Sequence, residues 1–186
     1  MSFAMVSNTL GYYEEVDNLT GLFLFQVTHH GRTLRPAAIQ GLPGQTFGAG
    51  QAVWNGATGW ILGEVLGKGT RFPFPPAAIA INGAQTRLVA LPRPLKPSAI
   101  TSPRATVATI VGRVRHRWTV LNTRDGGQRW VSVRLSQVSS PAGVGVSGLY
   151  RFQHDVWLLV GSHLYEGPND AAQGWRRVPQ PKSQGG

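Results

Sequence analysis

Arginines and tryptophans lie close together in one stretch of this sequence, and this combination can bind polyanions. Arg113, Arg115 and Arg117 would share one face of a regular strand, since successive side chains point to opposite faces. Such a row can follow a phosphate backbone while a tryptophan stacks on a base. The candidate contact residues are Arg113, Arg115, Arg117, Arg124, Arg129 and Arg134, beside Trp118 and Trp130. Alternatively, both tryptophans belong to the core and the arginines face solvent or an acidic protein. We expect contact with protein in preference to contact with nucleic acid.

Other residues that could do chemistry lack the spacing or context which that chemistry requires. Residues 143–148 match G-x-G-x-x-G, but the next four residues continue as a strand where a dinucleotide site needs a helix. The scattered histidines have no metal-ligand spacing; they are His29, His30, His116, His154 and His163. The absence of cysteine excludes disulfides, thiolate metal sites and cysteine nucleophiles. We therefore expect no cofactor, no metal site and no enzymatic activity.

The charge of the sequence is unevenly divided. Residues 1–65 hold two arginines against four carboxylates, a net charge of −2, while the remainder holds 16 basic and four acidic residues, a net charge of +12. This basic part indicates contact with a polyanion or an acidic protein surface. Only 14% of residues are charged, well below the usual quarter. The apolar stretch at residues 22–27 is too short for a signal core or a bilayer span, so we expect cytoplasm or a particle assembled there, and no membrane partner.

The elements that must position these residues are strands, because no long segment shows the 3.6-residue period of an amphipathic helix. Gly and Pro are plentiful, at 24 and 13 residues, and they bound short apolar runs. Within residues 1–91 the runs are 21–29, 32–35, 52–54, 60–62, 78–81 and 86–90, with an Asn82-Gly83 turn between the last two. The sequence therefore predicts a mainly β fold with little helix, beginning with a small OB-like β-barrel over residues 1–91.

The rest of the chain is predicted to string β-hairpin modules between connectors. Four prolines stiffen the first connector, and glycines loosen the second. The predicted order is a Pro-rich linker at 92–104, a basic β-hairpin module at 105–140, a Gly-rich joint at 141–148, a C-terminal β-hairpin module at 149–179 and a flexible tail at 180–186.

Tryptophans recur at similar places in these modules. Trp60, Trp118 and Trp157 each follow a turn and lead into an apolar strand. Tryptophan buries a large area with few torsions to restrict, so we expect these three and Trp130 to be packing anchors.

The segment at residues 50–65 resembles small OB-like barrels in virion proteins of tailed bacteriophages, especially tail-tip, hub and connector components. Their form G-D-x-V-x-V, turn, G-x-W-V-V-L-G is matched at Gly50, Val53, Gly59, Trp60, Ile61, Leu62 and Gly63, with Gln51 in place of the aspartate. Residues 149–160 are similar to "LYRF…W" hairpins of phage tail and fibre proteins.

The resemblance implies a non-enzymatic structural subunit of a phage tail, baseplate or head-to-tail connector. Its partners would be copies of itself and other virion proteins, and its location would be the virion, assembled in the host cytoplasm. Low charge and serial β units agree with this function. OB-like barrels also bind single-stranded nucleic acid, so a nucleic-acid-binding protein is the alternative.

Overall fold

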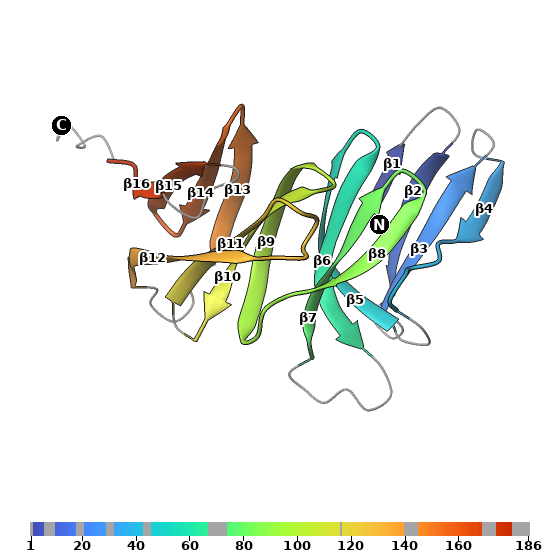
Figure 1. Cartoon of the computed structure of the whole chain (residues 1–186), viewed down its shortest axis with the longest axis horizontal. Coiled ribbons are helices and arrows are strands. Elements are labelled where there is room, and N and C mark those ends of the chain that lie inside the picture. Colours follow the sequence, from blue (N-terminus) through green and yellow to red (C-terminus); the bar gives the residue numbers. More distant parts are fainter. Residues whose placement is uncertain are drawn as a thin grey trace, which may run out of the picture.

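The computed structural model of this chain is built from strands, and the residues that it describes include no helix (Figure 1). The described residues are 2–5, 10–17, 21–28, 32–42, 46–66, 74–115, 117–139, 145–168 and 174–179. The prediction of a mainly β fold with little helix is therefore confirmed.

Successive strands pair into four antiparallel sheets, each of four strands in chain order. The first sheet is β1 (Ser2–Met5), β2 (Leu10–Asp17), β3 (Gly21–Thr28) and β4 (Thr33–Pro36). The second is β5 (Thr46–Asn55), β6 (Thr58–Leu66), β7 (Pro76–Asn82) and β8 (Gln85–Ala90). The third is β9 (Leu95–Arg104), β10 (Val107–Val114), β11 (Arg117–Thr123) and β12 (Val131–Ser139). The fourth is β13 (Val146–Phe152), β14 (Asp155–Val160), β15 (His163–Pro168) and β16 (Arg176–Arg177).

Tight turns hold these strands in sequential order. Gly56 and Gly83 adopt positive φ angles of 54° and 57° in the turns after β5 and β7. Two-residue turns of this kind favour glycine because side chains disfavour that conformation, and they return the chain beside the preceding strand. The predicted Asn82-Gly83 turn lies between β7 and β8, with Asn82 opposite Gln85.

The sheets pack face to face in a row, from the first sheet at the right of Figure 1 to the fourth at the left. Each pair of neighbours encloses an apolar core. Ile61 packs in the core shared with the first sheet, whereas its neighbours Trp60 and Leu62 pack in the core shared with the third. Because side chains alternate across a strand, a sheet covered on both sides needs continuous apolar runs, as β6 and β10 have.

The predicted barrel over residues 1–91 is present only in a partly barrel-like, open form. These residues form two separate sheets that pack on each other, and no described strand of the first sheet pairs with one of the second. The physical reason is that β6 and β7 carry apolar residues on both faces, so both faces need cover. A small closed barrel buries only the inner face of each strand.

The connectors also differ from the predictions. Within the predicted linker at 92–104, residues 95–104 form β9, the first strand of the third sheet. Its prolines are compatible with pairing because β9 lies at a sheet edge, where an N–H need not bond. Within the predicted joint at 141–148, residues 146–148 belong to β13. Residues 141–144 and the predicted tail at 180–186 lie outside the described residues.

Candidate functional site

The three arginines of the predicted stripe do not share a face. Arg113 lies in β10, Arg115 lies in the following turn with a positive φ of 58°, and Arg117 begins β11. In the antiparallel register Arg113 is opposite Trp118, whereas Arg117 is opposite Val114. Since residues opposite one another share a face and neighbours alternate, Arg113 and Arg117 belong to opposite faces. The assumption of one regular strand was wrong because the chain reverses at Arg115.

Arg113 contacts the protein's own aromatic residue. Its guanidinium carbon lies 4.5 Å from the centre of the Trp118 ring, in cation–π contact. Trp118 is 1% exposed and packs in the core between the third and fourth sheets. Arg115 and Arg117 are exposed. Arg113 thus covers the edge of a core, whereas Arg115 and Arg117 are exposed to solvent.

Arg124 and Arg129 lie on a hydrogen-bonded turn that joins β11 to β12. Asp125 accepts hydrogen bonds from the Arg129 N–H at 2.9 Å and the Thr123 hydroxyl at 2.8 Å. The Thr123 oxygen also accepts from the Gly127 N–H at 2.8 Å. The Arg129 N–H, aided by the Thr123 hydroxyl, lowers the pKa of Asp125 below its ordinary value of 3.8. Both arginine side chains are exposed on this turn.

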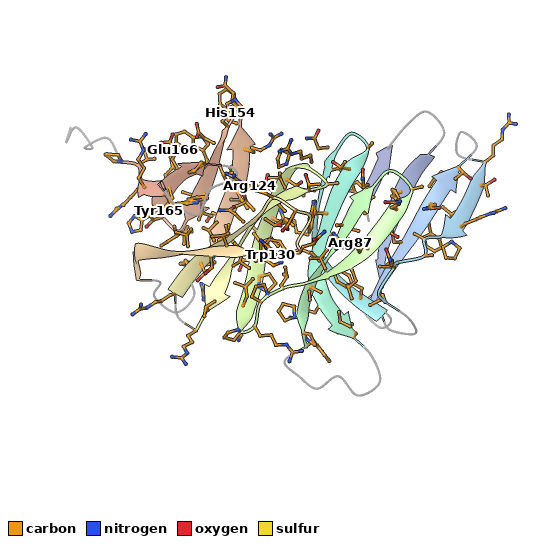
Figure 2. The ribbon with its side chains drawn as sticks, in the orientation of Figure 1. Arg87, Arg124, Trp130, His154, Tyr165 and Glu166 are labelled. Carbon is orange, nitrogen blue, oxygen red and sulfur yellow. The ribbon has the colours of Figure 1, made fainter. Side chains whose placement is uncertain are left out.

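The turn is also fixed to the second sheet. Arg87 of β8 donates to the Gly126 carbonyl at 2.6 Å, and the Gly126 N–H donates to the Thr106 carbonyl at 2.8 Å. Trp130, labelled in Figure 2, lies at the end of the turn and packs against the core between the second and third sheets. There it meets Trp60 edge to face, with 6.3 Å between the ring centres. The turn therefore positions Trp130 between two sheets.

A repeated spacing that the sequence analysis missed marks this turn. Residues 125–130 read D-G-G-Q-R-W, and residues 170–175 read D-A-A-Q-G-W, which is the same D-x-x-Q-x-W spacing. Trp130 immediately precedes β12, and Trp175 immediately precedes β16, so each tryptophan introduces the last strand of its sheet. Trp175 packs against the core between the third and fourth sheets. The repeat could have revealed that the third and fourth sheets are equivalent units.

The remaining predicted site residues are dispersed. Arg134 lies in β12 opposite Thr119, and its side chain is outside the described part. Trp60 is fully buried, and Trp118 nearly so. Trp157 differs, because it is half-buried on the face of β14 that points away from the third sheet. Its neighbours Val156 and Leu158 are fully buried, and Leu158 packs towards the third sheet.

This outer face of the fourth sheet carries an apolar cluster. The register places Tyr150 opposite Trp157, Leu159 opposite Leu164, and Phe152 on the same side two residues after Tyr150. Tyr150 is 65% exposed and Phe152 is 68% exposed, two of the large hydrophobic residues that the structure leaves open. We call the five residues Tyr150, Phe152, Trp157, Leu159 and Leu164 the terminal face.

Charged side chains on this side of the sheet lie at its margin. Glu166 lies opposite Trp157, and its carboxylate accepts a hydrogen bond from the Arg176 guanidinium at 3.0 Å. Asp155 lies opposite Phe152 on the same side, two residues before Trp157. Arg151 is opposite Val156 in the register, on the side that faces the third sheet. The terminal face is thus an apolar surface with an ion pair and Asp155 at its margin.

A cavity of about 510 Å³ lies where β5 and β9 approach each other. Gly50 and Ser98 line it, and each is the extra residue where its strand shifts register against the neighbouring strand. Gln51 lines it too, and its side-chain oxygen accepts the Ile100 N–H at 2.9 Å. Glu64 is the one ionisable residue of its lining. None of the predicted contact arginines reaches this cavity.

Within the described ranges, His, Cys, Asp and Glu side chains form no group of three suited to a metal ion. His154 is exposed, His163 contacts Arg177, and the other three histidines lie outside the described residues. In the same ranges, no helix is long and apolar enough to cross a membrane.

Comparison with known proteins gives a likeness of fold. No family model matches the sequence, and no curated protein matches it. Among solved structures the chain is similar to "YCF48 from Cyanidioschyzon merolae", with 15% identity and a TM-score of 0.55 over 97% of this chain and 56% of that one. It also matches "YCF48 bound to D1 peptide", with 14% identity and a TM-score of 0.48 over 96% of this chain and 66% of that one.

The chain therefore spans less than two thirds of either structure's length. YCF48 is a β-propeller protein, and propellers are built from four-stranded sheets, or blades, set side by side. The four successive sheets of this chain have the same internal order and the same face-to-face packing. At this level of identity the likeness concerns the fold alone, which is a row of propeller-type blades.

Proposed function

We propose that this chain is a non-enzymatic assembly module that binds a protein partner through the terminal face. The observation that carries the proposal is the exposure of Tyr150 and Phe152, at 65% and 68%, beside the half-buried Trp157. Contiguous apolar surface of this kind is uncommon on a free protein and marks binding sites. Tyrosine, tryptophan and phenylalanine are the residues that protein interfaces favour.

Protein is a better-matched partner than nucleic acid for this surface. Single-stranded nucleic acid needs aromatic rings set in a basic groove. Here Arg176 is paired with Glu166, and Arg151 belongs to the opposite side of the sheet. The predicted arginine stripe is divided between two faces and a turn. The phage tail, baseplate or connector predicted from sequence stays a prediction about which assembly the module joins.

Site-specific photo-crosslinking tests the proposal. A benzoylphenylalanine at position 150 should form an adduct with another protein chain in the organism that encodes this protein. The same probe at Gln85, an exposed residue of β8, is the matched control and should form none. The absence of an adduct at 150, or equal adducts at both positions, would contradict the proposal.

The nucleic-acid alternative has its own test. Binding of a fluorescent oligonucleotide is measured across a salt series. Tight binding, with a binding constant whose logarithm falls steeply with the logarithm of the salt concentration, would favour the alternative. Weak binding that Tyr150→Ser leaves unchanged supports a protein partner.

A further inference from the structure

The terminal face repeats the pattern of a face that is covered within the chain. Trp60 and Trp157 are the third residues of β6 and β14, the second strands of their sheets. Trp60 is opposite Val53, and Trp157 is opposite Tyr150 in the equivalent register. The third sheet covers Trp60, which is fully buried.

The next residue along the same face shows the same correspondence. Leu62 and Leu159 each lie two residues beyond the tryptophan of their strand, on the same side of it. Leu62 is 3% exposed beneath the third sheet, whereas Leu159 is half-buried. The terminal face is therefore built as one half of a contact between sheets.

We propose, on the basis of the proposed function, that its partner is the first sheet of a second copy of this chain. Tyr12 and Leu24 of the first sheet pack in the core shared with the second sheet. Their neighbours Phe25 and Val27 therefore belong to the outer side, where the register sets Pro36 and Leu34 opposite them. Val27 is only 9% exposed there. Leu34 is 56% exposed. The first and fourth sheets of one chain thus offer the two complementary halves of the contact that recurs inside it.

The size of the contact favours a pair of copies that makes the contact between the first and fourth sheets twice. The fourth sheet has three strands of six or seven residues and a last strand of two, so its face measures at most about 19 Å by about 20 Å at usual strand spacings. One such contact is smaller than the about 800 Å² per partner that stable complexes bury. A pair with twofold symmetry makes the contact twice, fourth sheet on first sheet in both directions, and so approaches that area.

Sedimentation velocity of the full chain over a concentration series tests the inference. The wild-type chain should sediment at twice its mass of 20.1 kDa. The double variant Tyr150→Ser/Phe152→Ser and the single variant Leu34→Glu should each weaken the pair at least tenfold. The change Gln85→Ser, at an exposed position outside both faces, is the control and should leave it unchanged. All four substituted positions are exposed, and circular dichroism checks that each variant keeps its fold.

A mixing experiment tests the orientation. One variant has an intact first sheet and the other an intact fourth sheet, so a mixture of the two, one labelled with a fluorophore, should form mixed pairs at lower concentration than either alone. A monomeric wild-type chain would overturn the inference, and so would a pair that is insensitive to Leu34→Glu. A monomer that still forms an adduct with another protein at position 150 leaves the proposed function intact, whereas a monomer without any adduct overturns both.

Discussion

The second sheet and the fourth sheet carry similar apolar faces. The face of the second sheet is covered by the third sheet, whereas the terminal face of the fourth sheet is open within the described part of the chain. In the covered face, Trp60 is fully buried and meets Trp130 edge to face at 6.3 Å. In the open face, the equivalent Trp157 is half-buried and its neighbour Tyr150 is 65% exposed. The residues that face outward are similar, so the difference lies in the cover. An apolar strand face stabilises the fold where the chain covers it, and we propose that it binds a partner where the chain leaves it open.

The largest expected difference between the two regions is in the cost of removing the tryptophan. Trp60→Ala should lower the free energy of unfolding by about 3–5 kcal/mol, because a large side chain is lost from a closed core. Trp157→Ala, the matched control, should cost about 1 kcal/mol, because its site is open to water on one side. Chemical denaturation of the isolated chain measures both. Equal losses would contradict the view that only the first site is covered.

A glycine in a covered contact, here the one between the first and second sheets, should respond to a methyl group differently from a glycine beside the terminal face. A Cβ at Gly63 would lie 2.0 Å from the Gly48 carbonyl oxygen and 2.7 Å from the Phe47 ring. Neither neighbour can move freely within the stack, so Gly63→Ala should cost about 1–3 kcal/mol. A Cβ at Gly148 would meet the Tyr150 ring at 2.3 Å, but this exposed side chain can turn away. Gly148→Ala should therefore stay within about 0.5 kcal/mol of wild type by the same denaturation measurement.

A pH-dependent contribution should come from the turn that positions Trp130 in the covered contact. The pKa of Asp125 is lowered in the folded chain, chiefly by the Arg129 N–H. Its contribution to stability is therefore complete above the ordinary value of 3.8 and is lost as the pH falls through the lower, folded value. Asp125→Asn should flatten the decline of unfolding free energy between about pH 5 and pH 2. The change Gln85→Ser, at an exposed position of β8, is the control; an equally flattened curve there would count against a special role for the turn.

The smallest expected effect is at the terminal face itself. Phe152→Ser should change the unfolding free energy of the monomer by no more than about 0.5 kcal/mol, because the ring is 68% exposed. It should also reduce the binding of a hydrophobic dye. A stability loss comparable to that of Trp60→Ala would show that the face is covered within the chain, and would remove the comparison on which the proposed function depends.

Local pattern predicted much of the secondary structure. The parts of β5 and β6 that the sequence predicted and the Asn82-Gly83 turn follow from turn residues and short apolar runs, which depend on near neighbours only. The strand β9 was missed because its prolines indicate a linker unless the strand is known to lie at an edge. The D-x-x-Q-x-W spacing shared by residues 125–130 and 170–175 was missed, because single residues were weighed apart from their repeat.

The candidate site was less accessible to prediction. The arginine stripe required one continuous strand, and the chain reverses at Arg115 instead. Trp118 and Trp157 have similar local sequences, an apolar run after a turn, yet one is 1% exposed and the other is half-buried. No local signal distinguishes them, since burial depends on which sheet comes next in space.

The sequence by itself determined that the chain forms strands, where most of them turn, and that several strands carry apolar residues on both faces. Only the tertiary structure decided that these strands stack as four propeller-type blades, that Arg113 rests on Trp118, and that the terminal face has no sheet over it among the described residues. The physical reason is the separation along the chain of the residues that determine each feature. Turn geometry and side-chain alternation are set within a few residues, whereas the cover of a face is supplied by residues from another sheet.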